Sequence, residues 1–231
     1  MSMLTEKRRA IMALFIMVLC LPVYAAQKSG ESEQGAERTF DNLVKVENSS
    51  VAEAFIDPDA DFSVFKRVAV LEPHVAFRTN WQRDQNRSRA GRVTVRDMER
   101  IKSDVATLFA RVFTDRLESA GYDVVEVAAD DVLVVRPAII DLDITAPDTR
   151  TPGRSRSFTT TSGAATLYIQ LFDSVSGEIL GRAVDRRTAR APSGVVQWST
   201  SVSNQADARR IFGRWADKLI DFLDRHHGEK P

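Results

Sequence analysis

The sequence predicts an α+β fold, a two-layer α/β sandwich in which two helices cover one mostly antiparallel, mixed sheet. Two long stretches have apolar residues at helical spacing, five segments have the short apolar runs of strands, and a turn signal separates the last two strands. These elements follow one another in the order β-α-β-β-β-β-α. Because a single sheet can bury the apolar stripes of both helices, this order favours two layers.

The first predicted helix begins after Thr94, which forms a capping-box pattern with Asp97 three residues later. Apolar residues then recur on one stripe over residues 98–117, and Gly121 ends the pattern. The second predicted helix lies near the C-terminus. It opens at Asn204 and Asp207, and its apolar stripe comprises Ala208, Ile211, Phe212, Trp215, Leu219, Phe222 and Leu223.

The strands are predicted from short apolar runs bounded by polar or turn residues. Val68 to Leu71 form the apolar centre of the first strand, and residues 78–92 after it are expected to form a polar loop. The sequence Ser174-Val175-Ser176-Gly177 separates the last two strands and is typical of a hairpin turn. The five predicted strands cover residues 65–77, 122–127, 132–145, 158–173 and 178–190.

The first 25 residues have the pattern of a cleaved secretory signal peptide. Basic residues 7–9 precede an unbroken apolar run from Ala10 to Leu21, and Val23 and Ala25 supply small residues at the two positions that a signal peptidase reads, so that cleavage is expected after Ala25. The apolar run is shorter than the roughly 20 residues that a transmembrane helix needs. We therefore expect export to the periplasm.

Cys20 raises an alternative localisation, that of a lipid-anchored protein. Bacterial lipoproteins are cleaved before a cysteine that then carries the lipid, but here the preceding residue is the large Leu19. Cleavage after Ala25 is favoured, and attachment to the membrane is expected only if Cys20 is lipidated, which would make the chain an outer-membrane lipoprotein. Because Cys20 is the single cysteine, the mature chain has neither a disulfide nor a thiol nucleophile.

The rest of the chain divides into a tail and one domain. Residues 26–39 contain no large apolar residue, and residues 40–56 have only isolated ones, so 26–58 are expected to form a flexible linker and a loosely packed N-terminal segment. Residues 59–228 are expected to form a single α/β domain. The chain has 32 basic and 32 acidic residues, and loss of the signal peptide removes three and one of these, leaving a formal charge of −2. A chain without excess positive charge is not expected to bind nucleic acid.

The sequence carries no recognisable catalytic motif. Glycine-rich phosphate loops and nucleophile elbows are absent, and only three histidines are present, so we expect neither a catalytic constellation nor a metal site nor a cofactor. Asp141 and Asp143 are two residues apart on one predicted strand, so both carboxylates are expected on one face. They could act as an acid–base pair. The favoured interpretation is a solvent-facing strand end, with Ile140, Leu142 and Ile144 facing the core.

Arginines gather in the predicted loop after the first strand. Guanidinium groups suit phosphate or carboxylate partners, so this loop is a candidate binding site, although a solvated charged surface is the favoured alternative. The third strand is expected to run back relative to the first, which would place residues 147–157 at the opposite end of the sheet from this loop. The candidate binding residues are Arg78, Trp81, Arg83, Arg87, Arg89 and Arg92, and further arginines follow the hairpin at Arg182, Arg186, Arg187 and Arg190.

Three stretches resemble the bacterial exported and lipoprotein-like proteins of domain-of-unknown-function family 3313. They are DFSVFKRVAVL at 61–71, VRPAIIDLDIT at 135–145, and residues 163–187, which include LFDSVSGEILGRAVDRR. Trp198 and the closing helix also fit, so that the resemblance spans residues 40–225. The resemblance implies an envelope protein of α/β type, and it implies no enzymatic reaction. The context of Cys20 departs from that of the lipoprotein members.

Together these observations favour a non-enzymatic periplasmic accessory domain. Its expected partner is an envelope protein or an anionic envelope polymer, contacted through a sheet edge or the arginine-rich loops. Two alternatives stay open: an envelope hydrolase that uses Asp141 and Asp143, and a small-molecule carrier with a pocket between the sheet and the helices. The sequence leaves the oligomeric state open.

Overall fold

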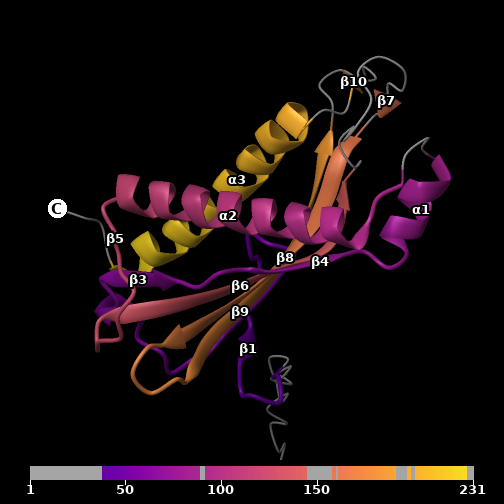
Figure 1. Ribbon diagram of the computed structural model, residues 1–231. Coiled ribbons are helices and arrows are strands. Elements are labelled where there is room, and N and C mark those ends of the chain that lie inside the picture. The colour runs from indigo at the N-terminus through magenta and orange to yellow at the C-terminus, as the bar shows by residue number, and fades with distance from the viewer. Residues whose placement is uncertain are drawn as a thin grey trace, which may run out of the picture. The chain divides into compact units, whose positions relative to one another are not determined.

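An eight-stranded mixed sheet organises the computed structural model, which describes residues 38–88, 92–144, 158–159, 161–190, 197–198 and 201–227. The strand order is β1-β2-β9-β8-β6-β3-β5, and β4 also pairs with β6 (Figure 1). The predicted signal peptide, its cleavage position Ala25 and Cys20 lie outside the described residues. The strands of this sheet are β1 (Val44–Lys45), β2 (Glu53–Ile56), β3 (Arg67–Val70), β4 (His74–Phe77), β5 (Asp123–Val124), β6 (Val132–Ile144), β8 (Thr161–Asp173) and β9 (Ile179–Arg190).

Two long helices lie on the same face of this sheet (Figure 1). They are α2 (Val95–Ser119) and α3 (Ser201–His227), and they pack against each other as well as on the strands. A 3-10 turn, η1 (Phe62–Val64), contacts α3, and β7 (Phe158–Thr159) pairs with β10 (Gln197–Trp198) in a separate two-stranded sheet. The predicted α+β fold, with two helices over a mixed sheet, is confirmed.

Helix α2 begins and ends where the sequence predicts. The backbone N–H of Asp97 donates to Thr94 Oγ1 at 3.2 Å, and the backbone N–H of Thr94 donates to Asp97 Oδ2 at 3.0 Å. This capping box satisfies two backbone donors that the first turn leaves unpaired. Gly121, with a φ of 85°, follows the last turn in the left-handed region that glycine adopts without strain. Helix α3 begins at Ser201, slightly earlier than the sequence predicts.

The core lies between the helices and the sheet. Phe109 and Phe113 of α2 stack with ring centroids 4.0 Å apart, and Phe212 of α3 meets Phe109 edge to face. Leu133 and Ile139 of β6 are fully buried beneath them. At the other end of α3, the hydroxyl of Tyr122 donates to Asp224 Oδ1 at 2.6 Å and lies 3.1 Å from His227 Nδ1, so the last turn of α3 is tied to the end of α2.

A buried carboxylate joins α3 to the sheet. Asp185 of β9 is 5 % exposed and points toward the helices. Its Oδ2 accepts from Trp215 Nε1 at 2.9 Å and from Arg187 Nε at 2.6 Å. Both donors compensate the carboxylate for lost hydration, so this polar group is tolerated in an otherwise apolar layer.

The first predicted strand is divided into two short strands. β3 and β4 both pair in parallel with β6, but Pro73 interrupts them because it has no N–H to donate. The second predicted strand, 122–127, is reduced to the two residues of β5. Leu71 still donates its N–H to the carbonyl of Val135 before the break.

The direction of β6 corrects the predicted topology. β6 runs parallel to β3 and β4, with Phe77 opposite Leu142, and does not run back. The short β5 allows residues 125–131 to return the chain to the starting end, where the carbonyl of Asp131 accepts from the N–H groups of Lys66 and Arg67. The expected reversal of the third strand is therefore wrong, and β6 ends at the same end of the sheet as β4. Residues 147–157, predicted at the opposite end from the loop after the first strand, lie outside the described residues.

The segment that the sequence predicts as loosely packed contributes two strands. β2 pairs antiparallel with β9, from Glu53 opposite Val184 to Ile56 opposite Gly181, and β1 pairs with β2 at the sheet edge. Leu43, just before β1, is 1 % exposed. Strands of two and four residues are too short to show the alternation by which a sequence reveals a strand.

The predicted loop 78–92 contains a helix, α1 (Trp81–Ser88). Trp81 is 1 % exposed, stacks on Phe77 with ring centroids 3.9 Å apart, and donates its Nε1–H to the carbonyl of Ile144 at 2.8 Å. Around it, Val93 and Ile101 form a second apolar cluster. Polar side chains also hold this helix, since Gln82 Nε2 donates to the carbonyl of Val93 and the Val93 N–H donates to Asn86 Oδ1. Trp81 is the one large apolar residue of α1, so its sequence shows no apolar stripe.

Replacing Asp185 by Ala is expected to lower the free energy of unfolding by about 3 kcal/mol, because Trp215 and Arg187 both lose their acceptor in the interior. Chemical denaturation measures the change. Asp217→Ala is the matched control, because the Arg116–Asp217 pair is exposed and its removal should cost less than about 1 kcal/mol. Equal losses in the two variants would contradict a structural role for the buried carboxylate.

Trp81→Ala is expected to detach α1 from the sheet and to cost about 3–5 kcal/mol, since a large buried ring and its hydrogen bond are lost together. Limited proteolysis should then cut first within residues 81–88. The exposed Arg83 on the same helix gives the control, and Arg83→Ala should leave the cleavage pattern unchanged. An intact α1 in Trp81→Ala would show that other contacts hold this helix.

Candidate functional site

The arginine that opens the predicted binding loop is held by two carboxylates. Arg78 Nη1 donates to Asp84 Oδ2 at 2.7 Å, and Arg78 Nε lies 2.9 Å from Asp143 Oδ2. The hydrogen bond from Arg78 is the main cause that lowers the pKa of Asp84 below its ordinary value. The charge of Arg78 is therefore neutralised within the protein.

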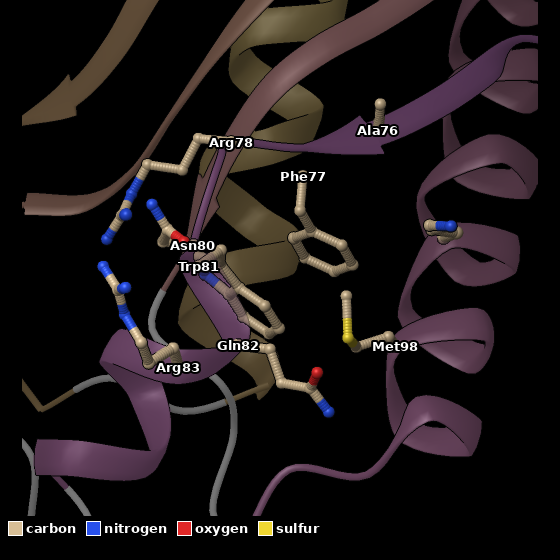
Figure 2. Close-up of a pocket in the computed structure, with 9 residues that line it drawn as sticks. Ala76, Phe77, Arg78, Asn80, Trp81, Gln82, Arg83 and Met98 are labelled. Carbon is tan, nitrogen blue, oxygen red and sulfur yellow. The ribbon is translucent and has the colours of Figure 1, made fainter.

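Two of the remaining predicted loop residues, Arg83 and Arg87, also act on Asp84, because their charges add to that of Arg78 in lowering the pKa of this carboxyl below its ordinary value. Arg83 is 57 % exposed and lies 3.7 Å from Asp84, and Arg87 and Arg92 are exposed. Arg89 lies outside the described residues. Trp81 is buried, so it packs α1 and does not present its ring to a ligand. Figure 2 shows the guanidinium groups of Arg78 and Arg83 near each other, on the opposite side of Trp81 from Met98.

The two predicted carboxylates are separated by a β-bulge. Asp141 has a φ of 51° and pairs with neither neighbouring strand, whereas Asp143 pairs opposite Ala164. The regular alternation expected for them is therefore wrong, and Asp143 is engaged by Arg78. On the predicted inner face, Leu142 is buried and Ile144 packs against the core as expected. Ile140 instead faces the opposite side with Thr166, and Ile139 is fully buried in its place.

A hollow of about 470 Å³ opens between β4, α1 and α2 (Figure 2). Phe77 and Met98 face it on one side, beside the edge of Trp81 and the amide of Gln82. Lys102 also lines it, and its Nζ donates to Glu99 at 2.9 Å. This hollow lies at the end of the sheet, beside α1, and not under both long helices, where the carrier alternative expects a pocket.

The face of the sheet opposite α2 and α3 carries a set of polar and aromatic side chains. On β8, Leu167, Ile169 and Leu171 are buried in the core between helices and sheet. Because successive side chains of a strand alternate, the residues between them point to the other face. The register adds their cross-strand partners to this face, which we call the helix-free face because α2 and α3, the long helices of the described residues, pack on the other side. Its central members are Arg136 and Ala138 of β6, Thr166, Tyr168 and Gln170 of β8, and Arg182, Val184 and Arg186 of β9.

Two arginines of the helix-free face lie diagonally on either side of Tyr168. Arg136 pairs opposite Gln170, two residues from Tyr168 in one direction, and Arg186 pairs opposite Thr166, two residues away in the other. Both arginines are exposed, and neither forms an ion pair with a described carboxylate. The nearest polar contact of Arg186 is Thr166 Oγ1, at 3.4 Å. Diagonal neighbours lie within reach of long side chains.

A third arginine of this face already holds a carboxylate. Arg182 pairs with Asp41 of the segment before β1, and its guanidinium also lies 5.9 Å from the centre of the Phe40 ring. Burial raises the pKa of Asp41, but hydrogen bonds from Thr39 and Arg182 lower it further, so the pKa lies below its ordinary value. The helix-free face therefore binds an anionic group supplied by the chain itself.

Sequence reasoning missed the centre of this face. The signal was present as the period-2 alternation of residues 165–171, with Arg182 and Arg186 at even positions of the next strand. The loop arginines form a cluster in the sequence itself, because they lie within 15 consecutive residues, 78–92. Arg136 and Arg186 come together only through the pairing of β6, β8 and β9.

In the part of the chain that the structure describes, His, Cys, Asp and Glu side chains do not form a group of three that could hold a metal ion. Within the same residues, none of the helices has both the length and the apolar character needed to cross a bilayer.

Comparison with solved structures finds loose similarities among bacterial proteins. The PelC dodecamer from Paraburkholderia phytofirmans is 14% identical, with 67% of this chain and 89% of that chain covered and a TM-score of 0.35. Protein XCC0632 from Xanthomonas campestris is 10% identical over 71% of this chain and 86% of its own, with a TM-score of 0.40. A minor lipoprotein from Acinetobacter baumannii is 10% identical over 70% and 94%, with a TM-score of 0.31. At this similarity, nothing about function follows.

The sequence itself gives a closer assignment. No curated protein matches the chain at a significant level. The family model described as protein of unknown function (DUF3313) matches residues 32–219, which span most of the 231 residues and include all the strands of the sheet. The resemblance found in the strands and the closing helix is thereby confirmed, and the chain belongs to the DUF3313 family.

Proposed function

We propose that the chain is a non-enzymatic binding module of the bacterial cell envelope, exported by residues 1–25, and that it binds an anionic envelope polymer through the helix-free face. The observation that carries the proposal is the pair Arg136 and Arg186, two exposed guanidinium groups on one side of the sheet without an ion pair to a described carboxylate. Guanidinium groups suit carboxylate and phosphate partners because they donate two hydrogen bonds in one plane.

The helix-free face is a better candidate than the loop after β4. At that loop Arg78 is shared between Asp84 and Asp143, so an incoming anion would have to displace an internal carboxylate. Arg136 and Arg186 form no ion pair with a described carboxylate, although Glu53 of β2, opposite Val184, lies diagonal to Arg186. An open sheet face with polar side chains also suits an extended ligand, whereas enclosed pockets suit small ones.

The charge pair predicts a specific loss of binding. The chain without its signal peptide should bind polyglutamate or polygalacturonate, and Arg136→Gln combined with Arg186→Gln should weaken this binding about tenfold or more, because two charge-assisted contacts are lost. Calorimetry at low and high salt measures the effect, and salt should weaken binding to the unsubstituted chain.

The loop arginines give the matched control. Arg83→Gln combined with Arg87→Gln removes the same charge from exposed positions of α1 and should change affinity by less than about twofold. If neither polymer binds, or if the two double variants lose the same affinity, the proposed role of the helix-free face is wrong.

The export proposal makes an independent prediction. The protein recovered from the periplasm should have the intact mass of a chain that begins at Ala26, since Val23 and Ala25 are small residues at the two positions that a signal peptidase reads and Leu19 disfavours cleavage at Cys20. A chain that begins with a lipid-modified Cys20 would instead place the module on a membrane.

A further inference from the structure

We infer that the anionic polymer is a polysaccharide whose sugars carry carboxylates, and that Tyr168 is the platform on which a sugar ring lies between Arg136 and Arg186. This inference rests on the proposed function and specifies its ligand. Three features of the helix-free face support it: the position of Tyr168, the separation of the two arginines, and the carboxylate that Arg182 already binds.

Tyr168 lies at the centre of the face. Its cross-strand partners are Ala138 on β6 and Val184 on β9, both of them uncharged. Tyr168 is half-buried, so its ring is supported by the sheet and still meets solvent. An aromatic ring at the middle of an open sheet face, with uncharged neighbours on both sides, suits the C–H face of a sugar ring. A rigid aromatic surface also costs little entropy when it binds.

The separation of the arginines favours a polymer over a small anion. Arg136 and Arg186 lie on the two strands flanking β8, opposite positions that are four residues apart. Strand spacing and residue rise place their backbones about 16 Å apart on the diagonal. A chain of several carboxylate-bearing sugar rings can extend over this distance, with one carboxylate near each arginine and a ring between them over Tyr168.

The chemistry of the anion is indicated by Asp41. Its carboxylate is bound by Arg182 on the same face, where the Phe40 ring lies near the same guanidinium. Gln170 lies between Arg136 and Arg182 in the strand register. Its amide has both donors and an acceptor, so it can bind sugar hydroxyl groups. Carboxylates beside hydroxyl-bearing rings match this combination of guanidinium, amide and aromatic groups.

The test compares two carboxylate polymers, one with sugar rings and one without. Polygalacturonate should bind at least about fivefold more tightly than polyglutamate of similar length and charge, and Tyr168→Leu should remove this advantage while leaving polyglutamate affinity within about twofold. Tyr168→Phe retains the ring and should retain the preference. Thermal unfolding of both variants checks that each one folds.

The outcomes separate the inference from the proposed function. Equal affinity for the two polymers, with both lost in the Arg136→Gln and Arg186→Gln double variant, would overturn the polysaccharide inference and leave the anionic face in place. A preference for polygalacturonate that survives Tyr168→Leu would overturn the role of Tyr168. If Tyr168→Leu does not fold, loss of the preference in Tyr168→Phe would also overturn the role of the ring. Binding of neither polymer would overturn both proposals.

Discussion

Pairing along β6 is the constraint on which the rest of the structure depends. This strand of 13 residues is paired antiparallel with β8 on one side and parallel with β3 and β4 on the other. Its inward residues, among them Leu133, Val135 and Ile139, are fully buried and form the floor of the core. Because α2 and α3 pack over this floor, the position of both helices and the existence of a helix-free face follow from the same strand.

Elements with a regular apolar period could be predicted from the sequence. Helix α2, with its capping box at Thr94, and the long strands β6, β8 and β9 follow the predicted pattern closely. Helix α1 was missed because Trp81 and the hydrogen bonds of polar side chains such as Asn86 anchor it, and these residues form no apolar period. The direction of β6 was also missed, since it depends on residues 125–131, a short connection whose path no apolar pattern records.

The charged residues of the candidate site likewise could not be located from the sequence alone. Arginines that are close in sequence, such as Arg78 and Arg83, are drawn to Asp84 and so are paired within the protein. Arg136 and Arg186, 50 positions apart, are brought to one face only by the register of three strands. Sequence composition therefore indicates arginine as the candidate class of side chain, whereas sheet pairing decides which of the described arginines have no ion pair to a described carboxylate.

The bulge at Asp141 has a consequence for how this fold can vary in length. In a regular strand, gain or loss of one residue exchanges the inner and outer faces of everything beyond it. Asp141 pairs with neither β4 nor β8, and Leu142 beyond it still faces the core. A chain without this residue would keep the inward and outward order of β6. Position 141 is thus a place where β6 can lose one residue while the residues beyond it keep their inner and outer faces.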